Sequence, residues 1–459
     1  MNSNSTVTDL RPLERISTDV LVVGGGAAGV AAAITAARQG VRVMLLERYG
    51  FCGGGAVAGM SGTICGMYMA SDVPGAKPDQ LVHGFAAEFA QRMSACGGLT
   101  PPVRYGKTYS LVHDPLAWRN VADAMLADAG VKVLFHTLAT EVLLEGGERV
   151  AGVQAFTKQG KFRIEAGLTV DASGDADLAA MAGFSTRVGH EGTVQNPTMI
   201  FRIQGVDVAR FTATYGPDTI LGEAVSKQIV EMNATGRYRL PRAKIFLFPS
   251  PRAGELLCNC TRITGADGRE LNSILVRDFT EAEIEGRKQV FEYARFFRDH
   301  LQGCERSWVN DTGVQVGVRQ SRQIAGTAVL ANSDVVQGTK FTTGIARSAW
   351  PIELHAGARP RLSWLIDDYY EIPYECFVPE RGESLLAAGR CLSAEHEAMA
   401  SARVTAQCFS YGQAIGRAAS LALREKLAPR QIDGAALRDL LNRDGAGLGV
   451  APARARAIA

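Results

Sequence analysis

Residues 18–29 decide the fold and read TDVLVVGGGAAG. The apolar run 18–23 ends in glycines, a pattern typical of a buried parallel strand. Residues 27–38 are rich in alanine and contain no proline, which predicts a helix, and Gly40 follows as a C-cap. Residues 41–46 are apolar again and predict a second strand. Together they predict a right-handed β-α-β unit on parallel strands.

The glycines of this stretch have the spacing Gly-x-Gly-x-x-Gly. Gly24 allows the tight turn, Gly26 lets the backbone approach a pyrophosphate, and Gly29 lets the helix pack closely on the sheet. Ala28 lies in the first turn of the helix, whose free N–H groups attract phosphate. Glu47 ends the second strand, where its carboxylate can accept hydrogen bonds from ribose hydroxyls. The pattern therefore predicts a dinucleotide site.

A second glycine cluster favours FAD over NAD as the dinucleotide. Arg48 is followed by Cys52, Gly53 and Gly54, in an irregular segment (residues 50–66) that we expect to be a loop facing the ligand. A long, extended FAD needs this further approach of the backbone, whereas an NAD-binding domain has no obvious use for it. No second Gly-x-Gly-x-x-Gly follows for a nicotinamide cofactor. Cys52 could link covalently to the flavin or have a redox role, but the default interpretation is a small buried hydrophobe.

Five stretches of the chain, residues 19–29, 46–54, 170–178, 374–390 and 401–416, resemble the FAD-dependent oxidoreductases of the glutathione-reductase structural class. The resemblance implies a second FAD-contacting turn in the middle of the chain, where Ser173 departs from the usual threonine. It also implies that a late Gly-Arg strand end and a helix close over the ribityl chain and the flavin ring. The candidate FAD contacts are Gly24, Gly26, Ala28, Gly29, Glu47, Arg48, Cys52, Gly53, Gly54, Val142, Ser173, Gly174, Asp175, Gly389, Arg390, Gly412 and Ala414.

The expected fold class is α/β: a Rossmann-like FAD-binding domain with a parallel sheet, plus an inserted α+β substrate domain. The FAD-binding domain comprises residues 1–191 and 345–440, the substrate or cap domain residues 192–344, and a flexible C-terminal tail residues 441–459. Asp114 and a following proline predict a helix up to about residue 130. Thr280 and Glu283 form the pattern of a capping box and predict a helix to about residue 301. The other expected strands are 131–135, 140–144, 150–158, 161–166, 198–203, 244–248, 273–276 and 384–388, and a last helix is expected at 403–424.

Composition narrows the classes of partner. The formal net charge is +2, so charge does not point to nucleic acid or to an anionic membrane. No run of about 20 apolar residues predicts a membrane span, and the polar first eighteen residues do not resemble a secretory signal. Nine scattered cysteines fit reduced thiols in a cytoplasmic protein, and their spacing predicts no metal site. A homodimer is the usual expectation for a soluble protein of this size.

Two histidines are candidates for proton transfer, because imidazole titrates near neutral pH. His355 lies where the chain returns from the predicted insert, and His396 follows the last predicted strand. Both should lie near the domain interface, although a structural role is equally plausible for each. Arg322 and Arg403 are candidate catalytic residues that could bind a carboxylate, as could Arg319, while internal ion pairs are the alternative interpretation.

These features favour a dehydrogenase or oxidase that takes a hydride from a small organic substrate. The alternatives are an ene-reductase resembling the fumarate reductase flavoproteins, a flavin monooxygenase, and a non-catalytic flavin-binding or assembly protein. The electron acceptor stays open between oxygen, a quinone and a partner flavoprotein.

Overall fold

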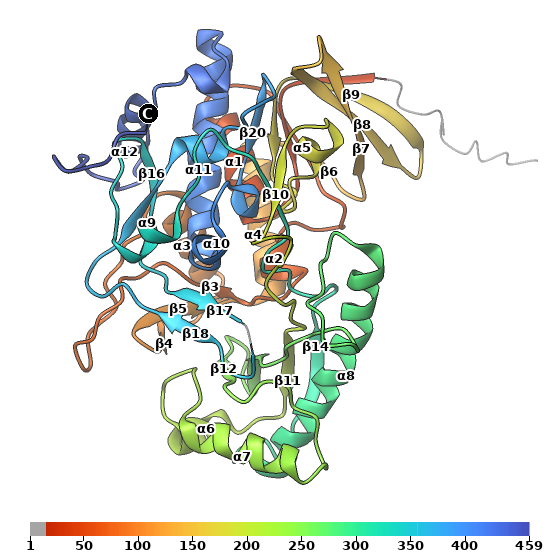
Figure 1. The fold of residues 1–459 in the computed structure, drawn as a ribbon, viewed down its shortest axis with the longest axis vertical. Helices are drawn as coiled ribbons and strands as arrows, with labels where there is room; N and C mark the ends of the chain where they lie inside the picture. Colours follow the sequence, from red (N-terminus) through yellow and green to blue (C-terminus); the bar gives the residue numbers. More distant parts are fainter. Residues whose placement is uncertain (1–14, 356, 459) are drawn as a thin grey trace, which may run out of the picture.

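A seven-stranded, largely parallel sheet organises the upper half of the molecule in Figure 1. The computed structural model describes residues 15–355 and 357–458. The strand order is β6-β2-β1-β9-β8-β7, and β20 pairs with β9. Neighbours pair in parallel from β6 to β9 and between β20 and β9, whereas β7, β8 and β9 form an antiparallel meander. The strands are β1 (Arg15–Val23), β2 (Val43–Leu46), β6 (Lys132–Leu134), β7 (Leu138–Glu145), β8 (Arg149–Thr157), β9 (Gly160–Asp171) and β20 (Leu385–Ala387).

The predicted β-α-β unit is confirmed. Helix α1 (Ala27–Arg38) joins β1 to β2, and Gly40 follows it with a φ of 86°, a left-handed conformation that glycine adopts without strain. Helix α11 (Thr405–Glu425) lies directly on α1. A Cβ on Gly412 would lie 2.1 Å from the carbonyl oxygen of Ala28, and one on Gly416 would lie 2.3 Å from that of Ala32. Only glycine permits this approach of the two helices.

Four further helices surround this core: α3 (Phe85–Ala95), α4 (Pro115–Asp128), α10 (His396–Ala402) and α12 (Gly434–Arg443). Asp114 caps α4, as predicted, and accepts hydrogen bonds from the backbone N–H groups of Leu116 and Ala117. Residues 50–66 were expected to lack regular elements, and this expectation was wrong. They contain a short helix α2 (Gly54–Val57) and strand β3 (Thr63–Ile64), because β3 pairs with β5 (Thr108–Val112).

The lower, green part of Figure 1 is built on an antiparallel sheet in the order β12-β13-β11-β14. These strands are β11 (Phe201–Gln204), β12 (Phe246–Pro249), β13 (Glu255–Asn259) and β14 (Trp308–Thr312). They pack with α6 (Val208–Tyr215), α7 (Glu223–Ala234) and α8 (Val276–His300) around a core formed within residues 199–316. This range falls inside the predicted insert, whose boundaries at 192 and 344 stay predictions.

Two predictions about this part of the chain were wrong. Residues 273–276, expected as a strand, instead form a turn over 273–275 and the first residue of α8. The helix begins at Val276 rather than at Thr280, so the pattern of Thr280 and Glu283 is not a cap. The Thr280 hydroxyl instead donates to the carbonyl of Val276 within the helix. A local capping pattern was overridden because the turn before Thr280 has contacts of its own: Phe279 packs against the core of the insert, and the buried carboxylate of Asp278 accepts a hydrogen bond from Arg269.

Buried charges connect the two parts. Arg202 on β11 and Glu255 on β13 form an ion pair of 2.6 Å between completely buried side chains, and Arg202 also donates to the carbonyl of His113. Arg252 contacts Asp114, the cap of α4, at 2.6 Å. The insert is therefore bound by charge to the start of α4.

Small sheets complete the structure. They are the pairs β10 (Thr186–Val188) with β15 (Arg322–Ile324), β16 (Gly344–Ser348) with β19 (Tyr370–Pro373), and β17 (Ile352–Leu354) with β18 (Arg361–Ser363), and β4 (Val103–Tyr105), which pairs with β5. The remaining short elements are α5 (Asp177–Met181), α9 (Asn332–Val336) and 3-10 turns at 374–377, 389–391 and 429–431. Near the C-terminus Arg456 pairs with Asp334 at 2.7 Å, so the predicted tail contacts α9, while its flexibility stays a prediction.

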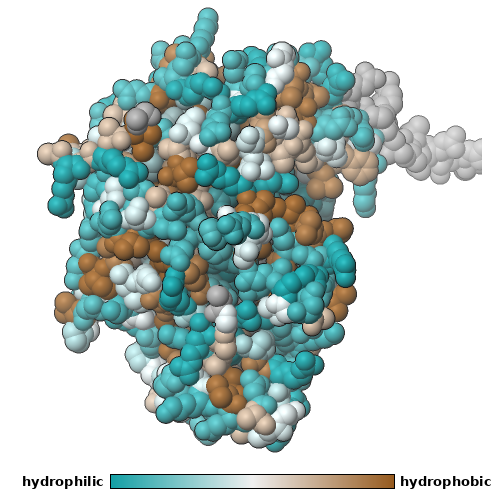
Figure 2. All heavy atoms as spheres, in the orientation of Figure 1, coloured by the Kyte–Doolittle hydropathy of each residue, from teal (hydrophilic) through white to brown (hydrophobic). Residues whose placement is uncertain are grey.

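The surface carries no dominant apolar face in the view of Figure 2, where apolar side chains form separate patches among hydrophilic ones. In the part of the chain that the structure describes, no helix combines the length and hydrophobicity needed to span a membrane.

A stability prediction follows from His113. The imidazole is fully buried, its ring centroid lies 4.6 Å from that of Trp118, and neither ring nitrogen has a hydrogen-bond partner among the described residues. Burial, together with the charge of Arg202, lowers the pKa of His113 to about 3. Between that value and the ordinary histidine pKa of about 6.5, the unfolded chain binds the extra proton, so stability falls as the pH falls through this window.

We expect His113→Phe to remove this dependence. Between about pH 6.5 and about pH 5, its free energy of unfolding should fall by about 2 kcal/mol less than that of the wild type. Urea unfolding at both pH values measures the difference, with the exposed His83→Phe as the matched control. Equal losses in the wild type and His113→Phe would contradict the assignment.

Candidate functional site

One cavity, of about 310 Å³, joins the glycine loop to the insert. It begins at the carboxyl ends of β1, β2, β9 and β20, at Val23, Leu46, Ala172 and Ala388, where ligands of open parallel sheets bind. It continues past Cys65 and Cys408 to the sheet of the insert, where Phe248 and Asn259 line it. A ligand in this cavity therefore contacts both parts of the chain.

The end of the cavity at the parallel sheet has the shape of a dinucleotide cradle. Gly24 has a φ of 107°, and a Cβ there would lie 2.3 Å from the carbonyl oxygen of Ala172. A Cβ on Gly26 would meet only the Cα of Gly54, at 3.9 Å, and would otherwise project into open space. Helix α1 begins at Gly26 without a side-chain cap, which leaves its first N–H groups free for an anion. These residues fit the pyrophosphate of FAD.

Glu47 lies beside this cradle and is nearly completely buried. Its two carboxylate oxygens accept hydrogen bonds from the N–H groups of Gly25 and Tyr49, at 2.7 and 2.8 Å. Burial raises the pKa of Glu47 above its usual value, against the effect of these hydrogen bonds. Each oxygen keeps a second acceptor site, which suits a ribose hydroxyl. Arg48 reaches across to the insert, where its guanidinium donates to Gln315 at 2.5 Å.

The predicted second turn also lines the cavity. The Ser173 hydroxyl donates to the buried carboxylate of Asp171 at 2.6 Å, and Gly174 takes a φ of 87°. The guanidinium of Arg390 lies against Gly174 and 3.5 Å from Asp175. Its buried Nη1 has no partner among the described residues, so this nitrogen is available to a ligand.

The structure brings together in the lining most of the predicted FAD contacts: Gly24, Gly26, Ala28, Glu47, Arg48, Gly53, Gly54, Ser173, Gly174, Asp175, Gly389 and Arg390. It places five others behind the lining. Gly29 and Gly412 lie in tight backbone packing against Gly24 and α1, and Ala414 is buried in α11. Val142 lies on β7 against the apolar core of the sheet.

Cys52 is the fifth of these residues. Its thiol is buried behind Gly25, and burial raises its pKa well above the usual range, with a contribution from Glu47. A protonated thiol in this place fits the default interpretation of a small hydrophobe.

The end of the cavity near the insert holds a histidine–carboxylate pair at β17. His355 Nε2 lies 3.1 Å from Glu353 Oε1, and the Tyr105 hydroxyl donates to the same oxygen at 2.9 Å. All three residues are buried and line the cavity. Nδ1 of His355 has no partner among the described residues.

Charges around this pair determine its protonation. Burial alone would raise the pKa of Glu353, but the hydrogen bond from His355 and the charge of Arg403 lower it below its usual range. Burial and the charge of Arg319 lower the pKa of His355 well below the usual value, although Glu353 acts in the opposite sense. His355 is therefore neutral at neutral pH, with Nε2–H directed at Glu353 and the Nδ1 lone pair free.

Two of the predicted catalytic residues lie in the lining, and two do not. His355 and Arg403 line the cavity together with Arg319. Arg322 on β15 instead donates to the carbonyl of Asp175 at 2.9 Å and pairs with Asp177 at 2.6 Å. It therefore stabilises the predicted second FAD-contacting turn that follows β9. His396 begins α10 outside the lining, and burial, together with the charge of His190, lowers its pKa.

Sequence reasoning missed Glu353, Tyr105 and Asn259. The first had a readable signal: Glu353 lies two residues before His355, and side chains at this spacing share a face in extended chain. Tyr105 and Asn259 carried no local signal, because they reach the cavity from β4 and β13, far away in the sequence.

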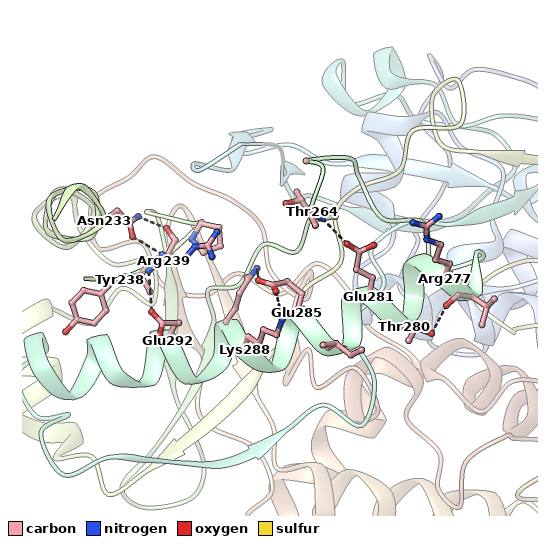
Figure 3. A pocket seen from close by; sticks show the side chains of 18 residues that line it. Asn233, Tyr238, Arg239, Thr264, Arg277, Thr280, Glu281, Glu285, Lys288 and Glu292 are labelled. Carbon is pink, nitrogen blue, oxygen red and sulfur yellow. Dashed lines mark hydrogen bonds and ion pairs between the residues drawn. The ribbon is translucent and has the colours of Figure 1, made fainter. Parts of the chain in front are cut away.

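A second, larger concavity of about 1260 Å³ lies along the outer side of α8 (Figure 3). Its polar side chains bond mainly within the insert itself. Lys288 lies 3.7 Å from Glu285, and the backbone N–H groups of Arg239 and Ala266 donate to Glu292 and Glu281. The cavity at the glycine loop, although smaller, combines a cradle with unpartnered buried groups, and it is the candidate active site.

A substitution at Gly26 tests the cradle. We expect Gly26→Ala to fold like the wild type, because its φ of −70° suits alanine and the new methyl meets no described atom closer than 3.9 Å. The new methyl would lie in the space that the pyrophosphate of FAD fills when bound, so the affinity for FAD should fall by about 100-fold or more. Titration of the apoprotein with FAD, followed by flavin fluorescence, measures the affinity. Gly222→Ala, at another uncrowded glycine before a helix, is the matched control; unchanged FAD affinity in Gly26→Ala would rule out this cradle.

Two solved structures are distantly similar to the chain. Among solved structures, a geranylgeranyl bacteriochlorophyll reductase-like protein from Thermoplasma acidophilum is 15% identical, with a TM-score of 0.49 over 94% of this chain and 85% of that chain. The flavin-dependent brominase Bmp2 is 14% identical, with a TM-score of 0.49 over 93% and 84% of the two chains. No curated protein matches the chain in sequence. The family described as FAD dependent oxidoreductase matches residues 19–441, most of the chain, and the protein therefore belongs to this family of FAD-binding oxidoreductases.

Proposed function

We propose that the protein is a dehydrogenase or oxidase that takes a hydride from a small organic substrate, with His355 as the base. The observation that carries the proposal is the unpartnered Nδ1 of a buried, neutral histidine in the same cavity as the dinucleotide cradle. Groups with perturbed pKa values in a shared cavity are typical of active sites. When bound, FAD supplies the acceptor for the two electrons that leave the substrate as hydride.

The residues of the chain handle the proton. Nδ1 of His355 accepts the proton of a substrate O–H or N–H as the adjacent carbon loses its hydride, which leaves a carbonyl or an imine. Glu353 holds the ring through Nε2 and stabilises the imidazolium that forms, since its carboxylate is 3.1 Å away. Tyr105 holds Glu353 from the other side. The trio fixes the orientation of the base before the substrate arrives.

Aromatic side chains in the lining favour a small substrate. Tyr105, Phe248 and Trp350 form an aromatic face, with ring centroids of Tyr105 and Trp350 5.0 Å apart. Such a face excludes water from the reacting atoms and strengthens the electrostatic effect of Glu353 on His355.

The first test is reduction of the bound FAD without oxygen. We expect at least one class among small alcohols, hydroxy acids and amines to bleach the flavin absorption of the purified holoprotein. If no donor bleaches it and chemically reduced protein is instead reoxidised by an activated alkene, hydride transfer runs in the opposite direction and the proposal fails. Reoxidation of the bleached protein by oxygen or by a quinone then distinguishes an oxidase from a dehydrogenase.

The second test concerns the base. His355→Asn should slow flavin reduction by about 100- to 10,000-fold, because it removes the proton acceptor and keeps a polar side chain. His396→Asn, the same substitution outside the lining, is the matched control and should reduce FAD at the wild-type rate.

The pH dependence of this step has a definite sign. Because the pKa of His355 is lowered, the base stays unprotonated below the ordinary histidine pKa of about 6.5. The rate of flavin reduction should therefore stay level from neutral pH to about pH 6 and fall at lower pH. Stopped-flow reduction across this range measures it. A rate that already halves near pH 6.5 would show that His355 is not the depressed base.

A further inference from the structure

The end of the cavity near the insert holds more positive than negative charge. Arg319 and Arg403 line this end of the cavity together with a single carboxylate, Glu353, and the charge of Arg242 also acts on that carboxylate, while His355 is neutral. Three guanidinium groups against one carboxylate leave two positive charges in excess. Buried charges are strongly disfavoured unless an opposite charge accompanies them. The excess therefore predicts an anion in the cavity.

The three arginines differ in how many of their donors are occupied. Arg242 donates to the carbonyl of Lys244 at 2.9 Å and lies outside the lining. Arg319 donates to the carbonyl of Asn196 at 2.7 Å and to Asn259 at 3.4 Å. The guanidinium of Arg403 has no hydrogen bond and no ion pair with any described residue, and its Nε is buried. Of the three, Arg403 is the one that lines the cavity with a guanidinium unbonded to any described residue.

The position of Arg403 is fixed although its head group is free. It is the C-cap of α10, and only Val404 separates it from α11, whose first residue Thr405 donates through its hydroxyl to the carbonyl of Thr63 at 3.0 Å. The backbone N–H of Arg403 is itself bonded to Met399. A rigid backbone with an unoccupied bidentate donor is the arrangement that binds a carboxylate with both oxygens.

We propose that the substrate is a small organic acid whose carboxylate is bound by Arg403, with Arg319 as the second positive charge. This inference rests on the proposed function and identifies its substrate class. A substrate whose carboxylate binds Arg403 and whose neighbouring O–H or N–H lies at Nδ1 of His355 is a 2-hydroxy or 2-amino acid. The unpartnered indole Nε1 of Trp350, buried in the same lining, is a further donor for that substrate.

Binding, rather than turnover, tests the inference. Lactate and lactamide differ only in the group that Arg403 would hold, a carboxylate in one and a neutral amide in the other, and pyruvate and pyruvamide form the corresponding product pair. Pyruvate and pyruvamide, which have no hydride to donate, are titrated into the oxidised holoprotein without oxygen, and binding is followed by calorimetry and by the shift of the flavin absorption bands. Lactate and lactamide are titrated into the chemically reduced holoprotein, which cannot accept their hydride, and binding is followed by calorimetry. We expect the acids to bind at least about 10-fold more tightly than their amides.

Arg403→Gln should weaken binding of the acids by about 100-fold and leave binding of the amides unchanged. Arg403→Lys keeps the charge but loses the bidentate fork, so an intermediate loss is expected, and it serves if the glutamine variant does not fold. Arg361→Gln, at an exposed arginine paired with Glu397, is the matched control and should bind the acids like the wild type.

Two results would overturn the inference. One is equal binding of acids and amides by the wild type. The other is an Arg403→Gln variant that binds the acids normally but has an altered flavin reduction potential, which would assign the guanidinium to the FAD ring. These failures are distinct from failure of the proposed function. If the acids bind through Arg403 but do not bleach the flavin, Arg403 is the carboxylate anchor and the proposed hydride transfer from these acids is wrong. If only an uncharged alcohol bleaches the flavin, the proposed function stands and the carboxylate anchor is wrong.

Discussion

The close approach of the backbone at Gly24 is the constraint on which the rest of the structure depends. A Cβ at this position would lie 2.3 Å from the carbonyl oxygen of Ala172, so β1 and the turn after β9 meet only because the residue is glycine. The same turn starts α1, and α11 then lies on α1 through Gly412 and Gly416. Because only Val404 separates Arg403 from α11, these contacts fix the position of the arginine relative to the cradle.

The fold could be predicted from the sequence where local pattern and tertiary packing agree. The β-α-β unit at residues 18–46 and the Asp114 cap are examples, because strand, turn and helix are each stabilised by neighbours in sequence. The expectations for residues 50–66 and 273–280 were wrong because distant partners decided those segments. Strand β3 exists through β5, and the start of α8 is set by packing in the insert.

The candidate site could likewise be predicted where local pattern suffices, and not where residues distant in the sequence contribute. The cradle was readable, since glycine spacing records backbone geometry directly. The reacting end was readable only in part. His355 and Arg403 were predicted from their places in the chain, but the carboxylate of Glu353 that contacts His355 and the hydroxyl of Tyr105 that holds this carboxylate come from β17 and β4. A sequence shows that an arginine is present; it does not show whether its donors are occupied, and that difference separates Arg403 from Arg322.

Asp114 has two partners in different parts of the molecule. Its carboxylate caps α4 of the FAD-binding half and also holds Arg252 of the insert, next to the buried pair of Arg202 and Glu255. Loss of this one carboxylate would loosen a helix on one side of the cavity and a strand connection on the other. The two halves thus share a single point of weakness, at a residue that does not itself line the cavity of the candidate active site.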